Sequence, residues 1–238
     1  MEVKKAVILA AGKGTRMKDL TKDMPKPMAL VRGKPILEYI LTGLRDFAGV
    51  KDFFIVTGHC AEVVENYFKN GNDWNVSITY GRQEIPDGTG KAPELAKHWA
   101  CHDSFWLIYG DILIDPSEYG EMLASLKNEA LISARRGENV KFGGAVVFDE
   151  NFLLKDLIEK SDKPISPWYN AGIYIFPPEI FNYTSRLQKS ARGEYELTDA
   201  IRAMARGGIK IQGYEIKKSW VDVRDPQVLT NLNQSAVT

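Results

Sequence analysis

The sequence predicts an α/β fold built on a largely parallel sheet, and three observations support this prediction. Short apolar runs rich in β-branched and aromatic residues, such as 53–58 and 104–111, are typical of buried strands. Segments with apolar residues at helical spacing, such as 35–47, lie between such runs. The two patterns alternate at short intervals, which indicates βαβ units.

The first half of the chain alternates most regularly. The run from Val7 to Ala11 predicts a buried strand that breaks into a glycine turn. In the helix expected over 35–47, Pro35 suits the first helical position and the apolar residues fall near one face. Further strands are expected at 53–58, 77–80 and 104–111, and helical segments through 63–68 and 92–99.

The second half is less regular. A helix is expected to start within 194–201, where Thr198 or Asp199 could cap it. No internal repeat and no strong linker interrupts the sequence, so we expect one continuous domain over 1–238 with two lobes, about 1–115 and about 116–238. Strands are expected at 142–149, 168–176, 210–216 and 219–223, with a Pro-rich connection at 164–167.

Composition argues against several kinds of partner. Lys and Arg together number 31, as do Asp and Glu, so a net charge of zero gives no global attraction to nucleic acid or an anionic membrane. No apolar run approaches the length of a membrane span, and the first residues lead straight into a strand-like run, so no signal peptide is expected. Cys60 and Cys101 are the only cysteines, which favours reduced thiols and a cytoplasmic setting.

A glycine-rich turn follows the first strand and is the most informative stretch of the sequence. Gly12 and Gly14 lack Cβ, so backbone N–H groups could approach an anion closely. Arg16 adds a fork of donors suited to phosphate. Lys26 follows on a segment stiffened by proline on both sides. These groups together predict a triphosphate site.

Other interpretations of this stretch fit less well. A tight turn with an exposed arginine is the simplest alternative, because glycine-rich turns are common. A dinucleotide fingerprint would need a third glycine where Met17 stands, and a P-loop would need a closing Gly-Lys-Ser/Thr that is absent. The sequence therefore favours a nucleoside-triphosphate site of a different kind.

The polar loop 83–92 follows the strand at 77–80 and opens onto a helical segment. It could be a plain connection. Loops at the carboxyl ends of parallel strands also line ligand crevices, which would place this loop beside the glycine turn. The amide of Gln83 could then match the imide edge of uracil or thymine, and Gly88 would leave room for the base.

Two carboxylates lie at expected strand ends. Asp111 follows the strand at 104–111, and Asp222 ends the one near 219–223. Such residues are often only helix caps or turn residues. Mg²⁺ usually takes one or two protein carboxylates and completes its shell with phosphate and water, so Asp111 alone would be a sufficient start for a metal site.

Two further groups of residues fit a structural explanation better than a functional one. His98, Cys101 and His102 have helical spacing suited to Zn²⁺, but a fourth ligand is not visible in the sequence. Trp99, Trp106, Trp168 and Trp220 lie inside apolar runs and fit a core better than stacking platforms. Trp168, close to Asn170, stays open as a residue that stacks on a sugar.

Nearly the whole chain resembles the sugar-1-phosphate nucleotidylyltransferases, because seven pieces occur in the order of that family. They are Gly12–Met17, Pro25–Pro27, Gln83–Gly90, Gly110-Asp111, Glu159-Lys160, Asn170–Gly172 and Trp220–Asp222. The segment 194–199 is also similar. The resemblance implies a Rossmann-like three-layer sandwich with a mostly parallel mixed central sheet, in which the first lobe binds nucleotide and the second binds sugar phosphate. It also implies an enzyme that joins a nucleoside triphosphate to a sugar 1-phosphate.

By this resemblance Arg16 and Lys26 grip the triphosphate, Lys160 meets the sugar phosphate, and Asp111 and Asp222 hold Mg²⁺. The residues implied at the nucleotide are Leu9, Ala11, Gly12, Gly14, Thr15, Gln83, Gly88 and Thr89. Those implied at the sugar are Gly143, Glu159 and Asn170. The loop from Gln83 is most similar to that of the uridylyltransferases, so UTP or dTTP is favoured.

Alternatives remain, and departures from the family bear on them. A cytidylyltransferase acting on a small phosphorylated alcohol, a guanylyltransferase, or a catalytically silent binding subunit are the other candidates, and the assembly is expected to be a monomer or a homodimer. Arg224-Asp225 stand where many members have Gly-Thr, so sugar or metal contacts are expected to differ locally. No hexapeptide repeats follow within the 238 residues, so neither a C-terminal β-helix nor acetyltransferase activity is expected.

Overall fold

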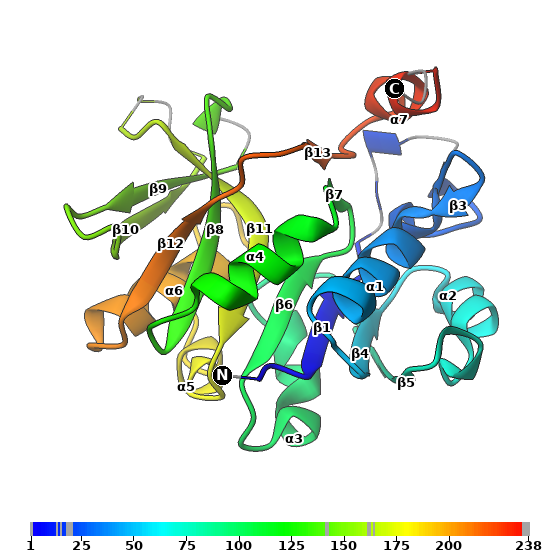
Figure 1. Cartoon of the computed structure of the whole chain (residues 1–238), viewed down its shortest axis with the longest axis horizontal. Helices are drawn as coiled ribbons and strands as arrows, with labels where there is room; N and C mark the ends of the chain where they lie inside the picture. The colour runs from blue at the N-terminus through cyan, green and yellow to red at the C-terminus, as the bar shows by residue number, and fades with distance from the viewer. Residues whose placement is uncertain are drawn as a thin grey trace.

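The computed structural model describes residues 2–12, 14, 16–17, 21–140, 143–160, 163 and 165–234. Its central sheet has the strand order β10-β9-β11-β6-β1-β4-β5, and β8 pairs with both β11 and β12 (Figure 1). The strands are β1 Lys5–Leu9, β4 Asp52–Thr57, β5 Ser77–Arg82, β6 Phe105–Tyr109, β8 Ala130–Arg136, β9 Gly144–Phe148, β10 Leu154–Glu159, β11 Trp168–Phe176 and β12 Ile211–Glu215.

Two small antiparallel pairs and several helices complete the fold. The pairs are β2 Leu30–Val31 with β3 Lys34–Pro35, and β7 Ile112–Ile114 with β13 Trp220–Asp222. The α-helices are α1 Ile36–Phe47, α2 Ala61–Phe68, α3 Lys97–Ala100, α4 Ser117–Ser125, α5 Ile180–Thr184, α6 Leu197–Arg206 and α7 Pro226–Gln234. The 3₁₀ helices are η2 Lys26–Met28, η3 Asn72–Trp74 and η4 Ala92–Ala96. None of the helices in the described ranges is long and apolar enough to cross a membrane.

The sheet is mixed, which confirms the predicted fold class. Strands β5, β4, β1 and β6 run parallel to their neighbours in that order. From β11 onward the path continues antiparallel through β9 and β10, and β8 is antiparallel to β11 but parallel to β12. The parallel character expected from the alternating pattern therefore belongs mainly to the first half of the chain.

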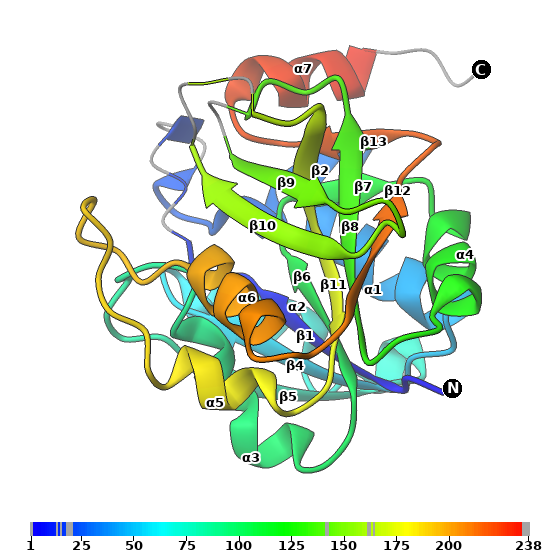
Figure 2. The ribbon, with the colours of Figure 1, turned by 90° about the vertical axis from the view of Figure 1, so that its left-hand side faces the viewer.

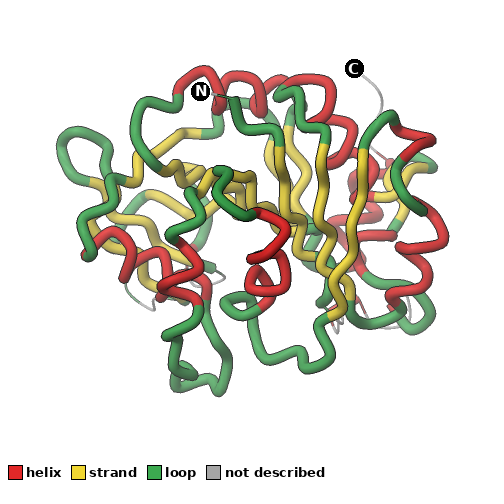
Figure 3. The backbone as a smooth tube through the Cα atoms, turned by 90° about the horizontal axis from the view of Figure 1, so that it is seen from below, coloured by secondary structure: helices red, strands yellow, loops and turns green. Residues whose placement is uncertain are grey.

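Helices cover both faces of the sheet, as the views in Figures 2 and 3 show. On β1, Ala6 and Ile8 join a core cluster with residues of α1, α2 and α4, whereas Val7 joins a second cluster with residues of η4, α3, α5 and α6. Successive residues of a strand point to opposite faces, so this alternation buries Ala6, Val7 and Ile8 on both faces of the sheet in a three-layer arrangement.

The first parallel strands end at one edge of the sheet, and the β7–β13 pair lies beyond that edge (Figure 1). The backbone N–H of Gly110 donates to the carbonyl of Leu9 at 2.9 Å, which extends the β1–β6 pairing past β6. A Cβ at position 110 would lie 2.8 Å from that carbonyl, so only glycine fits there without a shift. This edge is where the predicted phosphate and metal residues converge.

Some elements were missed by the sequence analysis or assigned differently. The buried strand β8 and the helix α4 were not predicted, and 92–99 forms a 3₁₀ turn followed by a short α-helix. The predicted caps Thr198 and Asp199 are wrong, because α6 begins at Leu197 and both residues lie inside it. The hydroxyl of Thr89 instead accepts the N–H of Leu197 at 3.3 Å, so a residue distant in sequence caps the helix.

Candidate functional site

A cleft of about 640 Å³ opens at the carboxyl edge of the parallel strands. Its walls come from the glycine turn, η2, the loop after β5, the β6–β7 turn, the segments around β9–β11, the loop before α6, and β13. Thr15 lies outside the described residues, but every other site residue expected from the sequence lines this one cleft. Those residues are Leu9, Ala11, Gly12, Gly14, Arg16, Lys26, Gln83, Gly88, Thr89, Asp111, Gly143, Glu159, Lys160, Asn170 and Asp222.

The glycine turn is closed by its own hydrogen bonds. The carbonyl of Gly14 accepts the N–H of Met17 at 2.7 Å and the hydroxyl of Thr21 at 3.0 Å. Gly14 has φ +61°, and a Cβ there would lie 2.9 Å from a methyl carbon of Thr21. A Cβ at Gly12, by contrast, would meet nothing within 4 Å, and Arg16 is exposed. Gly14 is therefore required for packing, while Gly12 and Arg16 border open space in the cleft.

Lys26 lies between the two predicted metal carboxylates. Its Nζ is 2.5 Å from Oδ2 of Asp111 and 3.8 Å from Oδ1 of Asp222. The β7–β13 pair brings the carboxylates together, because it places Asp222 opposite Ile112, the residue after Asp111. The N–H of Val223 also donates to the carbonyl of Asp111 at 3.0 Å. Residues from opposite ends of the chain thus form one charged cluster.

Electrostatics at this cluster suit a divalent cation. Burial, and next the negative charge of Asp111, raise the pKa of Asp222 to about 6, although Lys26, Arg224 and Arg16 oppose the shift. Two carboxylates so close to each other favour a bound cation. In the ranges given above, no group of three or more His, Cys, Asp or Glu side chains is arranged to hold a metal. The donor set fits Mg²⁺, which accepts two carboxylates when phosphate and water oxygens complete its shell.

The loop after β5 is folded around Gln83. The side-chain Nε2 of Gln83 donates to Oδ1 of Asp87 at 3.4 Å and to the carbonyl of Gly88 at 3.3 Å. These long bonds hold the amide at the cleft wall. Gly88 has φ +118°, and a Cβ there would lie 2.7 Å from the backbone N of Tyr195 and closer still to its carbonyl oxygen. The backbone of Tyr195 thus takes up the space that a Cβ at position 88 would need, and Gly88 itself lines the cleft.

Backbone hydrogen bonds join this loop to the segment before α6. The N–H of Tyr195 donates to the carbonyl of Asp87, and the N–H of Gly90 donates to the carbonyl of Tyr195, both at 2.8 Å. The bond from Leu197 to the Thr89 hydroxyl adds a third link. The loop predicted to hold the base is therefore fixed to the lobe predicted to hold the sugar.

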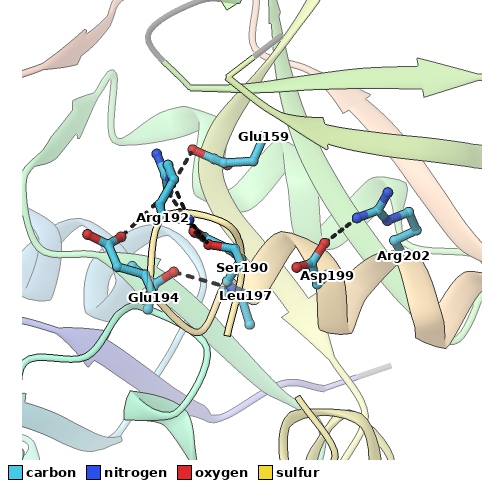
Figure 4. Close-up of polar contacts among 9 residues, drawn as sticks. Glu159, Ser190, Arg192, Glu194, Leu197, Asp199 and Arg202 are labelled. Carbon is cyan, nitrogen blue, oxygen red and sulfur yellow. Dashed lines mark hydrogen bonds and ion pairs between the residues drawn. The ribbon is translucent and has the colours of Figure 1, made fainter. Parts of the chain in front are cut away.

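An arginine that the sequence analysis did not single out organises the far wall of the cleft (Figure 4). Nη2 of Arg192 lies 2.7 Å from Oε1 of Glu196, 3.5 Å from Oε2 of Glu194 and 3.9 Å from Oε1 of Glu159. The Ser190 hydroxyl also donates to Glu196 at 2.9 Å. Burial, and next the charge of Glu196, raise the pKa of Glu159, and Arg192 opposes this.

Asn170 and Lys160 complete the same wall. The Asn170 side chain is buried, donates from Nδ2 to the Tyr174 hydroxyl at 2.7 Å, and accepts the N–H of Gly172 at 3.3 Å. Lys160 is exposed with φ +48°, and its N–H donates to the carbonyl of Gly143 at 2.8 Å. The Asn170 amide is thus held in place, while the Lys160 ammonium is presented to solvent at the cleft.

The alternative sites considered from the sequence do not form. His98, Cys101 and His102 do not build a metal cluster among the residues whose placement is described, and both cysteines are free thiols. Trp168 does not line the cleft; its ring packs on Arg136, Phe148 and Phe152. The expectation that Trp168 could stack on a sugar is therefore wrong. Trp220 lines the cleft instead and donates from Nε1 to the carbonyl of Ala171 at 3.0 Å.

Comparison with known proteins agrees with this geometry. The nucleotidyl transferase family model matches residues 5–237. The chain belongs to the nucleotidyl transferase family. It is 38% identical over 232 residues to the bifunctional protein GlmU of Methanococcus aeolicus, with 96% of this chain and 53% of that protein covered. It is 29% identical over 223 residues to the glucose-1-phosphate thymidylyltransferase of Neisseria meningitidis, with 92% and 77% covered.

A solved structure supports the same grouping. The structure of UDP-glucose pyrophosphorylase complexed with UDP-glucose has a TM-score of 0.87 and 25% sequence identity, and 97% of each chain is covered. This nucleotidyl transferase chain spans about half the length of the GlmU proteins it matches.

Several residues that line the cleft of this nucleotidyl transferase were not predicted from the sequence. Glu194 and Glu196 belong to the segment 194–199, which was found similar to the family, but no role was predicted for either residue. Arg192 lies just before them, but nothing in its local sequence marks it. The remaining residues that were missed include Tyr109 and Tyr169.

Proposed function

We propose that the chain transfers a nucleotidyl group from a nucleoside triphosphate to a sugar 1-phosphate and releases pyrophosphate, with UTP or dTTP as the preferred donor. The observation that carries this proposal is the position of Lys26 between Asp111 and Asp222, with Arg16 and Lys160 lining the same cleft. The names of the thymidylyltransferase and UDP-glucose pyrophosphorylase relatives support it.

The reaction needs charge neutralisation more than proton transfer. An oxygen of the sugar phosphate attacks the α-phosphorus, a new P–O bond forms, and the bond from the α-phosphorus to the bridging oxygen of the leaving pyrophosphate breaks. The nucleophile is already an anion, so no general base is required. The repulsion between two phosphate-bearing substrates must be offset by fixed positive charge and by alignment.

The chain provides these charges on both sides of the reacting phosphorus. Arg16 and the glycine turn would bind the β- and γ-phosphates of the donor, and Lys26 would lie against the α-phosphate beside the carboxylates. Lys160 and Arg192 would face the sugar phosphate, with Glu159 and Asn170 available to sugar hydroxyls. Mg²⁺ held by Asp111 and Asp222 would supply further neutralisation of phosphate charge when bound.

Base selection would rest on Gln83. Its amide can donate and accept, which suits the imide edge of uracil or thymine. The long hydrogen bonds from Nε2 to Asp87 and Gly88 are weak enough to be exchanged for a base. Guanine presents a different edge and a larger ring, so GTP should be a poor donor.

The test is a matrix of donors and acceptors. Purified protein with MgCl₂ is given UTP, dTTP, CTP, GTP or ATP together with glucose 1-phosphate, N-acetylglucosamine 1-phosphate or phosphocholine, and pyrophosphate release is measured. We expect release with UTP or dTTP and a sugar phosphate, and loss of release with EDTA. Turnover only with CTP and phosphocholine would favour a cytidylyltransferase. No turnover with any pair, despite retained UTP binding, would favour a silent binding subunit.

A further inference from the structure

Strand β11 is irregular where it borders the cleft. From Asn170 to Tyr174 it advances four residues, whereas its partner β8 advances only two, from Ala134 to Ile132. In a regular strand, residues four positions apart lie about 13 Å from each other. Here the Asn170 amide and the Tyr174 hydroxyl meet at 2.7 Å, because the extra residues of β11 bulge out of the pairing. The mechanism above gives no role to this bulge or to Tyr174.

Other parts of the chain satisfy the backbone of the bulge. Gly172 has φ +79°, a left-handed conformation that favours glycine. The N–H of Ile173 donates to the hydroxyl of the buried Ser133 at 3.2 Å. The carbonyl of Ala171 accepts the N–H of Nε1 of Trp220 at 3.0 Å. The bulge is therefore a fixed part of the cleft wall.

The ring of Tyr174 is held on two sides, so its hydroxyl has a defined position. Tyr174 is fully buried, and its ring stacks on Phe176 with the centroids 5.2 Å apart and meets the ring of Tyr109 edge-on at 5.9 Å. The hydroxyl lies 2.7 Å from Nδ2 and 3.0 Å from Oδ1 of Asn170. Because it contacts both polar atoms of the amide, it restricts rotation about the last bond of the asparagine side chain.

The Asn170 amide has one hydrogen-bonding group left for a ligand. Oδ1 can accept two hydrogen bonds, and the Gly172 N–H at 3.3 Å and the Tyr174 hydroxyl at 3.0 Å supply both. Nδ2 can donate two, and one goes to the Tyr174 hydroxyl. Among the residues whose positions are described, the second N–H of Nδ2 has no acceptor. Nδ2 is 3.4 Å from where a Cβ of Gly144 would lie, and Gly144 lines the cleft, so the missing side chain leaves Nδ2 open to the cleft.

We propose that Tyr174 positions the Asn170 amide so that it offers the acceptor substrate an N–H donor. The site then selects a sugar that carries a hydrogen-bond-accepting oxygen, from a hydroxyl or a carbonyl group, at the ring position facing this donor. A sugar without that oxygen would leave the half-enclosed N–H unpaired when the cleft is filled. Asn170 touches the substrate, and Tyr174 acts through Asn170. This inference deepens the proposed function and rests on it for the identity of the acceptor.

The experiment compares ligand binding by the wild type, Tyr174→Phe and Asn170→Asp. Tyr174→Phe removes only the hydroxyl, and Asn170→Asp replaces the N–H donor with an oxygen of similar size. Calorimetry measures Kd for UTP alone. In the presence of MgCl₂ and the unreactive donor α,β-methylene UTP, it also measures Kd for glucose 1-phosphate, for N-acetylglucosamine 1-phosphate, and for the monodeoxy analogues of whichever sugar phosphate binds the wild type more tightly.

Tyr119→Phe is the matched control, because Tyr119 is a buried tyrosine that does not line the cleft. Thermal unfolding checks that each variant is folded. A loss of stability alone would not change the preference between a sugar phosphate and its deoxy analogue, so this preference separates positioning from a purely structural role.

In the wild type, at least one monodeoxy analogue should bind about 10-fold more weakly than its parent, as for one lost hydrogen bond. In Tyr174→Phe the parent should bind about 5- to 20-fold more weakly, and the discrimination should fall to about twofold or less, since a mobile amide no longer aligns its N–H with the sugar oxygen. Asn170→Asp should lose this discrimination as well. The Kd of UTP should stay within about twofold in every variant, and Tyr119→Phe should match the wild type.

Unchanged discrimination in folded Tyr174→Phe, or an equal loss of UTP binding, would overturn the role of Tyr174. Discrimination retained by Asn170→Asp would overturn the assignment of the N–H donor, and this variant tests the assignment even if Tyr174→Phe does not fold. If the wild type releases no pyrophosphate in the matrix assay but shows the expected changes in binding, the proposed reaction fails and this inference stands. Turnover by a wild type that discriminates against no analogue would overturn this inference alone. A wild type that neither binds a sugar phosphate nor turns over overturns both.

Discussion

Because the loop after β5 is joined to the segment before α6, we expect Gly88→Ala to lower the stability of the fold strongly. At φ +118°, an alanine at position 88 is strained, and its Cβ would lie 2.7 Å from the backbone N of Tyr195. The collision involves backbone, which cannot swing away like a flexible side chain. The two hydrogen bonds at 2.8 Å that join Tyr195 to Asp87 and Gly90 should therefore be lost or lengthened.

The magnitude follows from these two contributions. The unfavourable backbone conformation costs about 1–3 kcal/mol, and each weakened hydrogen bond costs about 0.5–1.5 kcal/mol. The free energy of unfolding should fall by about 2–6 kcal/mol in total. In a chain of 238 residues, about 2–4 °C of Tm is lost per kcal/mol, so a fall in Tm of roughly 10 °C is expected.

Gly137→Ala is the matched control. Gly137 also has a positive φ, +86°, but a Cβ there would meet nothing within 4 Å, so only the backbone strain of about 1–2 kcal/mol applies. Differential scanning calorimetry gives the fall in Tm of each variant, and the difference between the two falls isolates the contribution of the contact with Tyr195. Because the joined segments face both substrates, Gly88→Ala should also raise the KM of donor and acceptor. Equal Tm values for the two variants, with only base preference changed at position 88, would refute this reasoning and restore the view that Gly88 makes room for the base.

The remaining predictions concern the base and the sugar wall. Gln83→Ala should lower kcat/KM for UTP, by a loss of about 1–3 kcal/mol in transition-state stabilisation, and should narrow the difference in kcat/KM between UTP and CTP, since a hydrogen-bond partner of the base is lost. Steady-state kinetics with both donors is the measurement, and an unchanged rate and preference order would show that Gln83 does not select the base. Glu159→Gln should raise Tm relative to the wild type, by more at pH 8 than at pH 4.5. A raised folded-state pKa means that Glu159 contributes stability below its unfolded pKa and loses it as pH rises through the folded pKa. A Tm difference that is constant with pH would contradict the burial of an ionised Glu159 beside Glu196.

Local sequence patterns predicted the strands of the first half and the residues at their ends. Apolar runs such as 105–108 are buried on both faces of the sheet, so their composition alone marks them. The resemblance to a known family added the order of the motifs and thereby the list of expected site residues. Fifteen of these residues line one cleft in the structure. Their individual roles remain predictions.

Features that depend on long-range contacts could not be read from the sequence. The Thr89 cap on α6 and the close approach of the Tyr195 backbone to Gly88 both join segments that no local pattern connects. The meeting of Asp111 and Asp222 depends on β7, a three-residue strand too short to give a periodic signal. Arg192 was missed because its importance comes from three glutamates placed around it by the fold.

The central claim is that Asp111 and Asp222 act together in the transfer of the nucleotidyl group, which carries the α-phosphorus, to a sugar phosphate. The most direct test follows UTP labelled at the α-phosphorus in the presence of Mg²⁺ and glucose 1-phosphate, with the wild type, Asp111→Asn and Asp222→Asn. We expect the wild type to place the label in a nucleotide sugar and none in pyrophosphate. Each variant should remain folded and lose about 100-fold or more in kcat, since stabilisation of transition-state charge is removed. Label in pyrophosphate, or near-native turnover by a folded variant at saturating Mg²⁺, would contradict the account.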